Sequence, residues 1–161
     1  MLSLQIILYI FSAACACAMA AIDWRIRIIP DALLFPFMLA GLALGELTGG
    51  LPWVDGGMPE SIIAACIGYA LGAVLNIAFK LKNKKKKGES KKTNSDPIGM
   101  GDIKLLGAGG IWLGVTGLSI AVASACLIGI AWGLCARQKY VPFAPFFFIG
   151  AIAAIIAGTI L

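Results

Sequence analysis

The sequence predicts an all-α integral membrane protein of about six transmembrane helices, with the N-terminus outside and a short, glycine-rich fourth helix. Three observations lead to this prediction. Apolar residues make up 60% of the 161 residues and charged residues only 13%, whereas about a quarter of a soluble domain is charged. The apolar residues form runs that approach the roughly 20 residues of a membrane span. The basic residues fall between these runs, except for Lys104 at the start of the fourth, and all lie on one predicted side of the membrane.

Six apolar runs define the predicted helices, and we treat 1–161 as a single domain. They cover residues 4–22, 32–49, 61–79, 103–116, 117–136 and 141–161. A polar, turn-rich stretch at 50–60 separates the second run from the third. The fourth run is short for a span, and its four glycines predict close packing against neighbouring helices.

Residues 80–98 are predicted to form a solvated basic loop, because they contain eight lysines and several small polar residues. With the N-terminus outside, this loop and every other Lys and Arg fall on the inner side. The outer stretch carries only Asp55 and Glu60 as charges. The positive-inside rule therefore supports this orientation. The net charge of +5 is localised, so we expect the loop to contact anionic lipid and expect no nucleic-acid partner.

The composition removes several kinds of chemistry. Histidine is absent, which excludes the commonest general base and metal ligand. The five cysteines form no C-x-x-C pair and lie in apolar stretches, so we interpret them as small apolar packing residues and expect neither a metal nor a cofactor. Residues 1–22 lack a basic start, so they are interpreted as a retained span and not as a cleaved signal peptide.

Two acidic residues fall at the same predicted membrane depth. Asp23 ends the first run and Asp102 begins the fourth. If two carboxyls meet, they can share a proton, so that one activates a water while the other polarises a carbonyl. Each residue also has a plainer interpretation, since Asp102 could merely cap its helix and Asp23 could mark a membrane boundary.

The neighbours of Asp102 favour a site that a peptide backbone could approach. Gly99 and Gly101 precede it within Gly99-Met100-Gly101-Asp102, and glycines permit close contact with a second chain. Because a helix N-terminus favours an anion, Asp102 is expected to be the ionised carboxyl and Asp23 the protonated one. Lys104 would support that assignment if it lies near Asp102, or it could simply anchor the helix at the membrane surface.

Three segments together resemble the prepilin peptidases, bacterial members of the GxGD aspartyl proteases. The first runs from Asp23 to Pro30-Asp31, the second is the G-x-G-D-x-K-L stretch from Gly99 to Leu105, and the third is P-F-x-P-F at 142–146. Their order and spacing agree across nearly the whole chain. The resemblance implies that Asp23 and Asp102 are catalytic, with Gly99, Gly101 and Lys104 supporting the motif.

The resemblance also implies a substrate and a location. The reaction would be removal of the short basic leader from prepilin-like proteins, at the cytoplasmic face of a prokaryotic inner membrane. A basic leader should not dock on the lysine loop, because like charges repel, so Asp31, Asp96 and the Asp23–Asp102 pair are better, though weak, candidates for contacting it. Asp31 is otherwise expected to cap or bound the second helix. Larger members carry an N-terminal, zinc-binding segment with paired cysteines and methylate the new N-terminus. This sequence has no C-x-x-C pair, so it resembles the compact form without that segment, and methyl transfer is doubtful.

Two other functions remain open from the residues alone. A six-span protein with inward-facing acids could be a transporter subunit, and it could also be a scaffold of a secretion assembly. Replacing Asp23 or Asp102 by Asn would stop leader removal in a peptidase, stop flux in a transporter and be tolerated in a scaffold. The sequence does not indicate a particular substrate or an oligomeric state.

Overall fold

The computed structural model describes residues 2–54, 56–86, 99–136 and 141–160, and these form five α-helices. They are α1 (Leu2–Ile26), α2 (Asp31–Thr48), α3 (Gly57–Lys86), α4 (Met100–Ala136) and α5 (Phe143–Ile160). All five are long and apolar enough to cross a membrane. The predicted fold class, an all-α protein with several membrane-spanning helices, is therefore confirmed.

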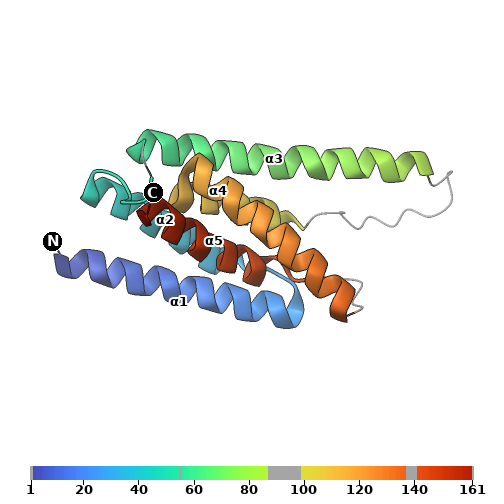
Figure 1. Cartoon of the computed structure of the whole chain (residues 1–161), viewed down its shortest axis with the longest axis horizontal. Helices are drawn as coiled ribbons and strands as arrows, with labels where there is room; N and C mark the ends of the chain where they lie inside the picture. Colours follow the sequence, from blue (N-terminus) through green and yellow to red (C-terminus); the bar gives the residue numbers. More distant parts are fainter. Residues whose placement is uncertain (1, 55, 87–98, 137–140, 161) are drawn as a thin grey trace.

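The helices form a bundle in which α4 packs against α2, α3 and α5, while α1 packs against α2 and α5. Figure 1 shows that the end of α1, the end of α3, both ends of α4 and the start of α5 lie at one end of the bundle. The chain termini and the connection from α2 to α3 lie at the other end. Residues far apart in the sequence are thus gathered at one end.

The connection between α1 and α2 is short and tightly shaped. Arg27 follows α1 with φ 57°, a left-handed conformation that few non-glycine residues adopt, and its N–H still bonds to the Asp23 carbonyl at 3.0 Å. Pro30 precedes α2 with an extended backbone (φ −74°, ψ 127°), and its fixed φ favours a helix start just after it. The turn therefore places α2 beside α1 within four residues.

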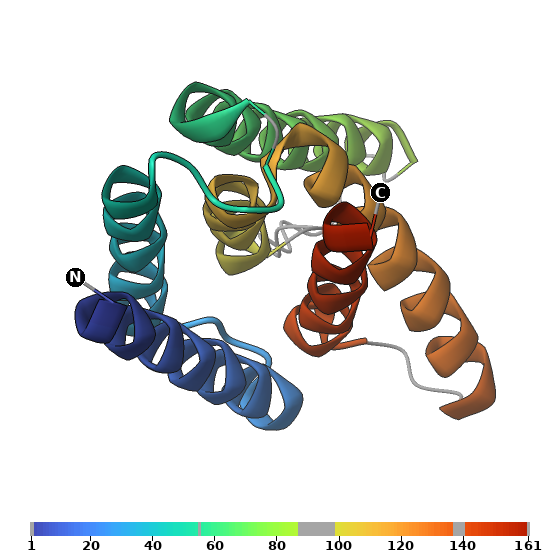
Figure 2. The ribbon, with the colours of Figure 1, turned by 60° about the vertical axis from the view of Figure 1, so that its left-hand side comes forward.

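The predicted count of six helices differs from the structure at α4. The fourth and fifth apolar runs both lie within this 37-residue helix, which is interrupted at Gly114 by a non-helical backbone (φ 65°, ψ −174°). Figures 1 and 2 show the ribbon changing direction sharply at that break. Gly68 of α3 lies close to both Leu106 and Leu118, on either side of the break, so the second half of α4 returns along the first. The sequence placed this boundary two residues later, at 116.

The basic loop predicted at 80–98 is also corrected in part. Helix α3 continues to Lys86, because lysine is a good helix former and the run of lysines need not end a helix. Residues 87–98, and with them Asp96, lie outside the described residues. The same is true of Asp55, Arg137 and Lys139, so their predicted roles are not addressed by the structure.

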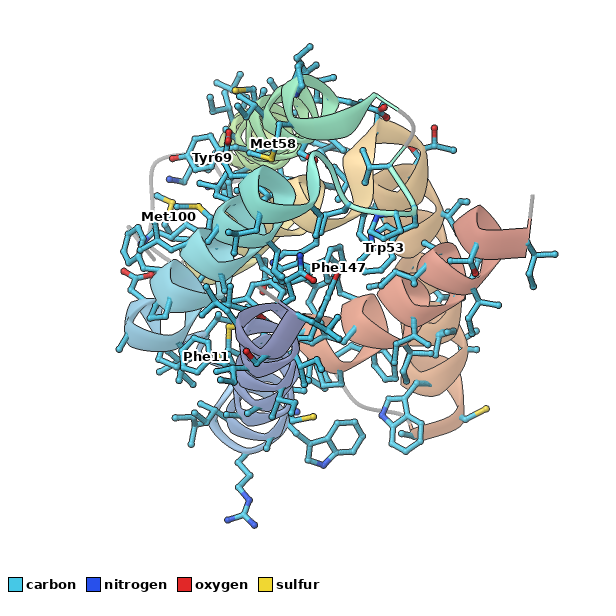
Figure 3. The ribbon with its side chains drawn as sticks, turned by 90° about the vertical axis from the view of Figure 1, so that its left-hand side faces the viewer. Phe11, Trp53, Met58, Tyr69, Met100 and Phe147 are labelled. Carbon is cyan, nitrogen blue, oxygen red and sulfur yellow. The ribbon has the colours of Figure 1, made fainter. Side chains whose placement is uncertain are left out.

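Small residues let the helices approach closely around a buried core. Phe147 of α5 is 1% exposed and stands in the middle of the bundle (Figure 3), where its ring occupies the space that a side chain on Gly109 would need. Met19, Leu44 and Leu105 are fully buried. Large apolar side chains such as Leu127 and Leu134 point outward, as expected for a surface that meets lipid.

Candidate active site

Asp23 lies in the last turns of α1 and is only 3% exposed. Its Oδ2 accepts a buried hydrogen bond of 2.8 Å from the backbone N–H of Ala144, in the first turn of α5. The N–H of Phe143 also donates to this carboxyl, and the positive charge of Arg27 is close to it. A buried carboxyl requires such partners, and here most of them come from another helix.

Asp102 is the third residue of α4 and is half-buried. Its carboxyl accepts a hydrogen bond from the backbone N–H of Gly99, and its own N–H bonds to the Gly99 carbonyl at 3.1 Å. An acidic side chain that reaches back to the residue before its helix is one half of a capping box. Asp102 therefore caps α4, which was the alternative role considered for it. The residue nevertheless remains partly exposed.

The structure brings the two aspartates together. Asp23 and Asp102 are close enough for their charges to interact directly, although they are 79 residues apart in the sequence (102 − 23). One comes from the end of α1 and the other from the start of α4, and both of these helix ends lie at the same end of the bundle (Figure 1). If two such carboxyls approach within a few Å of each other, they can share one proton and hold a water.

The two glycines of the motif have different neighbours. A Cβ on Gly101 would stand 3.0 Å from the Cβ of Ile29, which is buried in the turn after α1. Gly101 is therefore required for the turn that follows Asp23 to pack on the start of α4. A Cβ on Gly99 would lie 3.2 Å from Oδ2 of Asp102, so a side chain there would press on the candidate carboxyl itself.

Lys104 does not pair with Asp102. Its Nζ lies 2.6 Å from Oδ2 and 2.8 Å from Oδ1 of Asp31, the first residue of α2. The pair is partly exposed, at 31% for Lys104 and 50% for Asp31. It joins the start of α4 to the start of α2, so Asp31 is engaged within the protein. Its role as a contact for a basic leader stays a prediction.

The helix-end argument for the two aspartates also changes. It assumed that only Asp102 lies at a helix N-terminus, whereas Asp23 accepts N–H groups from the N-terminus of α5. Both carboxyls therefore face the positive end of a helix dipole. That argument no longer distinguishes an ionised Asp102 from a protonated Asp23.

Sequence reasoning did not find the partners of these side chains. The contribution of α5 is made by backbone N–H groups, which leave no distinctive side chain in the sequence; the two prolines around Phe143 and Ala144 are the one available signal. Ile29 is an ordinary apolar residue whose contact with Gly101 depends on the tertiary fold. Among the described residues, no group of three or more potential metal ligands stands together.

Comparison with known proteins places the chain in a family. Residues 10–134 match the type IV leader peptidase family. The chain is 34% identical over 149 residues to a protein of Burkholderia pseudomallei named prepilin leader peptidase/N-methyltransferase, covering 88% of this chain and 43% of that protein. It is 30% identical over 148 residues to a protein of the same name from Aeromonas salmonicida, covering 88% of this chain and 46% of the relative.

A more distant relative of that name, from Neisseria gonorrhoeae, is 26% identical over 127 residues, or 77% of this chain and 39% of the relative. The chain thus spans about half the length of the curated relatives that it matches. No solved structure matches it. The resemblance seen in three sequence segments is confirmed: the chain belongs to the type IV leader peptidase family.

Proposed function

We propose that this protein is a membrane aspartyl endopeptidase that removes the short basic leader from prepilin-like precursors, with Asp23 and Asp102 as its catalytic pair. The proposal rests on the placement of these two carboxyls, which lie at the same end of the bundle and near enough for the charge of Asp23 to act on Asp102. Membership of the leader peptidase family supports the class of reaction. The proposal covers peptide cleavage and does not extend to methyl transfer.

The chemistry requires one ionised and one protonated carboxyl. The ionised aspartate takes a proton from a water held between the two, and the water oxygen attacks the scissile carbonyl carbon. The protonated aspartate donates to the carbonyl oxygen as it becomes tetrahedral. As the intermediate collapses and its C–N bond breaks, the carboxyl that took the proton of water gives it to the leaving amine, and the other carboxyl takes a proton back from a hydroxyl of the intermediate. Because the two groups titrate as a pair, this cycle restores the shared proton.

The topology that we propose has six crossings and the N-terminus outside. A straight helix of 37 residues would extend about 55 Å, well beyond the roughly 30 Å hydrocarbon core, and α4 is interrupted at Gly114. Its two halves would cross separately, the first being short. The N-terminus, which Figure 1 draws at the far end of the bundle from the end of α1, would then be outside.

The same proposed orientation would put the aspartates at the cytoplasmic face of the inner membrane. Arg25, Lys82 and Lys104 belong to the end of α1, the end of α3 and the start of α4, which gather at one end of the bundle (Figure 1). Clustered basic residues favour the cytoplasmic side. A precursor whose leader is basic and whose following segment is an apolar helix would then present its cleavage site at this depth.

Coexpression with such a precursor tests the proposal. We expect Asp102→Asn to leave the precursor at its full length on a gel, while Glu46→Gln, which alters an exposed acid at the far end of α2, leaves cleavage intact. Full cleavage by Asp102→Asn would refute the catalytic assignment. Ion-dependent transport that requires Asp102, without leader removal by the wild-type protein, would favour the transporter. A scaffold would be favoured if the wild-type protein neither removed the leader nor transported ions, and if neither Asp102→Asn nor Glu46→Gln changed its behaviour.

A further inference from the structure

The first turn of α5 offers an unusually restricted set of backbone donors. The first four N–H groups of a helix have no acceptor within it, and in α5 these belong to residues 142–145. Pro142 and Pro145 have no N–H to donate. Phe143 and Ala144 are therefore the two residues in this turn with a free N–H.

Both of these N–H groups are directed to the same side chain. Ala144 donates to Oδ2 of Asp23 at 2.8 Å, and Phe143 donates to the same carboxyl. Asp23 and Ala144 are both buried, at 3% and 0% exposed, so the hydrogen bond between them does not compete with bulk water. The two prolines thus leave the start of α5 with a pair of donors and no other free N–H that could bond elsewhere.

We propose that the Phe143 and Ala144 N–H groups are a positioning device, which holds the Asp23 carboxyl in the orientation needed for it to act with Asp102. This inference rests on the proposed function. An aspartate carboxyl turns readily about its terminal bond, whereas two donors fixed in one helical turn hold it in one plane. The N–H groups act through Asp23 and touch neither the substrate nor the water.

The arrangement also ties the α5 segment to catalysis. Phe146 and Phe147 are buried and hold α5 in the bundle, while Pro142 and Pro145 fix φ near its helical value in the first turn. The orientation of Asp23 is therefore set by the packing of a helix that contributes no catalytic side chain. Small errors in such positioning reduce rate without necessarily reducing substrate affinity.

A proline at position 144 tests the proposal most sharply. Ala144→Pro removes the N–H that donates to Asp23, and proline is tolerated in a first helical turn. Ala144→Gly is the matched control, because it keeps the N–H. With purified enzyme and a prepilin-like substrate, we expect Ala144→Pro to lower kcat about 100-fold with KM unchanged, and Ala144→Gly to stay within a few-fold of wild type. An unchanged kcat in a folded Ala144→Pro variant, or equal losses in both variants, would overturn the inference.

If gel filtration shows that Ala144→Pro does not fold, a second pair of variants tests the same proposal. Phe143→Pro removes the other N–H, and Phe143→Ala keeps it while losing the ring contact with Phe147, 5.6 Å away between centroids. The same split in kcat is expected between them, and equal rates would refute the proposal. If neither proline variant folds, solid-state NMR of the wild-type protein can test for a contact between the Ala144 amide nitrogen and the Asp23 carboxyl carbon. Absence of that contact would refute the proposal that these N–H groups orient Asp23. Failure of the wild type to cleave would instead remove the proposed function itself.

Discussion

Glu60, in the first turn of α3, accepts a hydrogen bond of 3.3 Å from the backbone N–H of Val115, the residue that follows the break in α4. The other oxygen of the same carboxyl accepts the N–H of Gly56 at 2.7 Å. Interrupting a helix in apolar surroundings frees backbone groups that must find partners. Glu60 therefore serves as the cap for the second half of α4.

The other side of the break is capped as well. The indole N–H of Trp53 donates to the Trp112 carbonyl at 2.6 Å, a carbonyl that an unbroken helix would have paired with residue 116. Both caps come from residues 50–60, which the sequence identified only as a polar, turn-rich stretch. This stretch fixes where α4 reverses, and hence how far its first half carries Asp102 into the bundle.

Removing the Glu60 carboxyl should destabilise the protein. Glu60→Ala leaves the part-buried N–H of Val115 without its acceptor, for which we expect a loss of roughly 1–3 kcal/mol in the free energy of unfolding. The exposed N–H of Gly56 can bond to water instead. Glu60→Gln keeps an acceptor oxygen and should lose less. Thermal melts in detergent measure the effect, with Glu46→Ala as the control at an exposed acid of α2. Equal melting temperatures for Glu60→Ala and Glu46→Ala would show that the cap is unimportant.

Gly114 should tolerate no side chain. Its backbone angles fall in a region that is essentially restricted to glycine, and forcing another residue into it costs about 1–3 kcal/mol. In addition, a Cβ there would lie 3.0 Å from both Glu60 and Val54. We expect Gly114→Ala to lower the melting temperature. Gly129→Ala is the control, since its Cβ would make ordinary contacts of 3.7 and 3.8 Å with Val141 and Phe146; a melt of Gly114→Ala that matches this control would contradict the strained geometry.

The boundary at Gly114 illustrates what the sequence could predict. The apolar runs gave the existence and class of the helices, because hydrophobic length is a local property. The sequence also contained the glycines of the fourth run, yet nothing local distinguished Gly114 from Gly107, Gly109 or Gly110 as the place of the reversal. That choice depends on Glu60 and Trp53, whose contacts with α4 form only in the folded bundle.

The ion pair between Lys104 and Asp31 should contribute modestly to stability. Both groups are partly exposed, and ion pairs of this kind are typically worth about 0.2–1 kcal/mol. A double-mutant cycle with Lys104→Ala, Asp31→Ala and the double variant should therefore give a coupling energy below about 1 kcal/mol. Denaturation followed by tryptophan fluorescence would measure it. A coupling well above that range would show that the pair is a major structural lock between α2 and α4.

The contact between Gly109 and Phe147 predicts a compensating pair of substitutions. Gly109→Ala would push against the far end of the Phe147 ring, whereas Phe147→Leu shortens that side chain and leaves space. Each single variant should be less stable than wild type, and the double variant should recover on the order of 1 kcal/mol relative to the sum of the two losses. Thermal melts of the three variants measure this recovery. Losses that simply add would mean that α4 and α5 do not meet through this contact.

The site, like the helices, was predictable only where it depends on local features of the sequence. Asp23 and Asp102 are visible in the sequence because acids at membrane boundaries are rare and need partners. The donors that hold Asp23 were not visible, since they belong to the backbone of Phe143 and Ala144. Lys104 was visible as a charge, but its partner Asp31 was assigned a different role because the approach of α2 to α4 is a long-range feature.

The rate of leader cleavage by purified Asp23→Asn, Asp102→Asn and double variants tests the central claim most directly. Because two carboxyls that share one water act as a unit, each single variant should lose at least about 100-fold in kcat/KM, and the double variant should be no slower than the slower single one. A single variant that retains the wild-type rate, or losses that multiply in the double variant, would contradict a catalytic pair formed by these two aspartates.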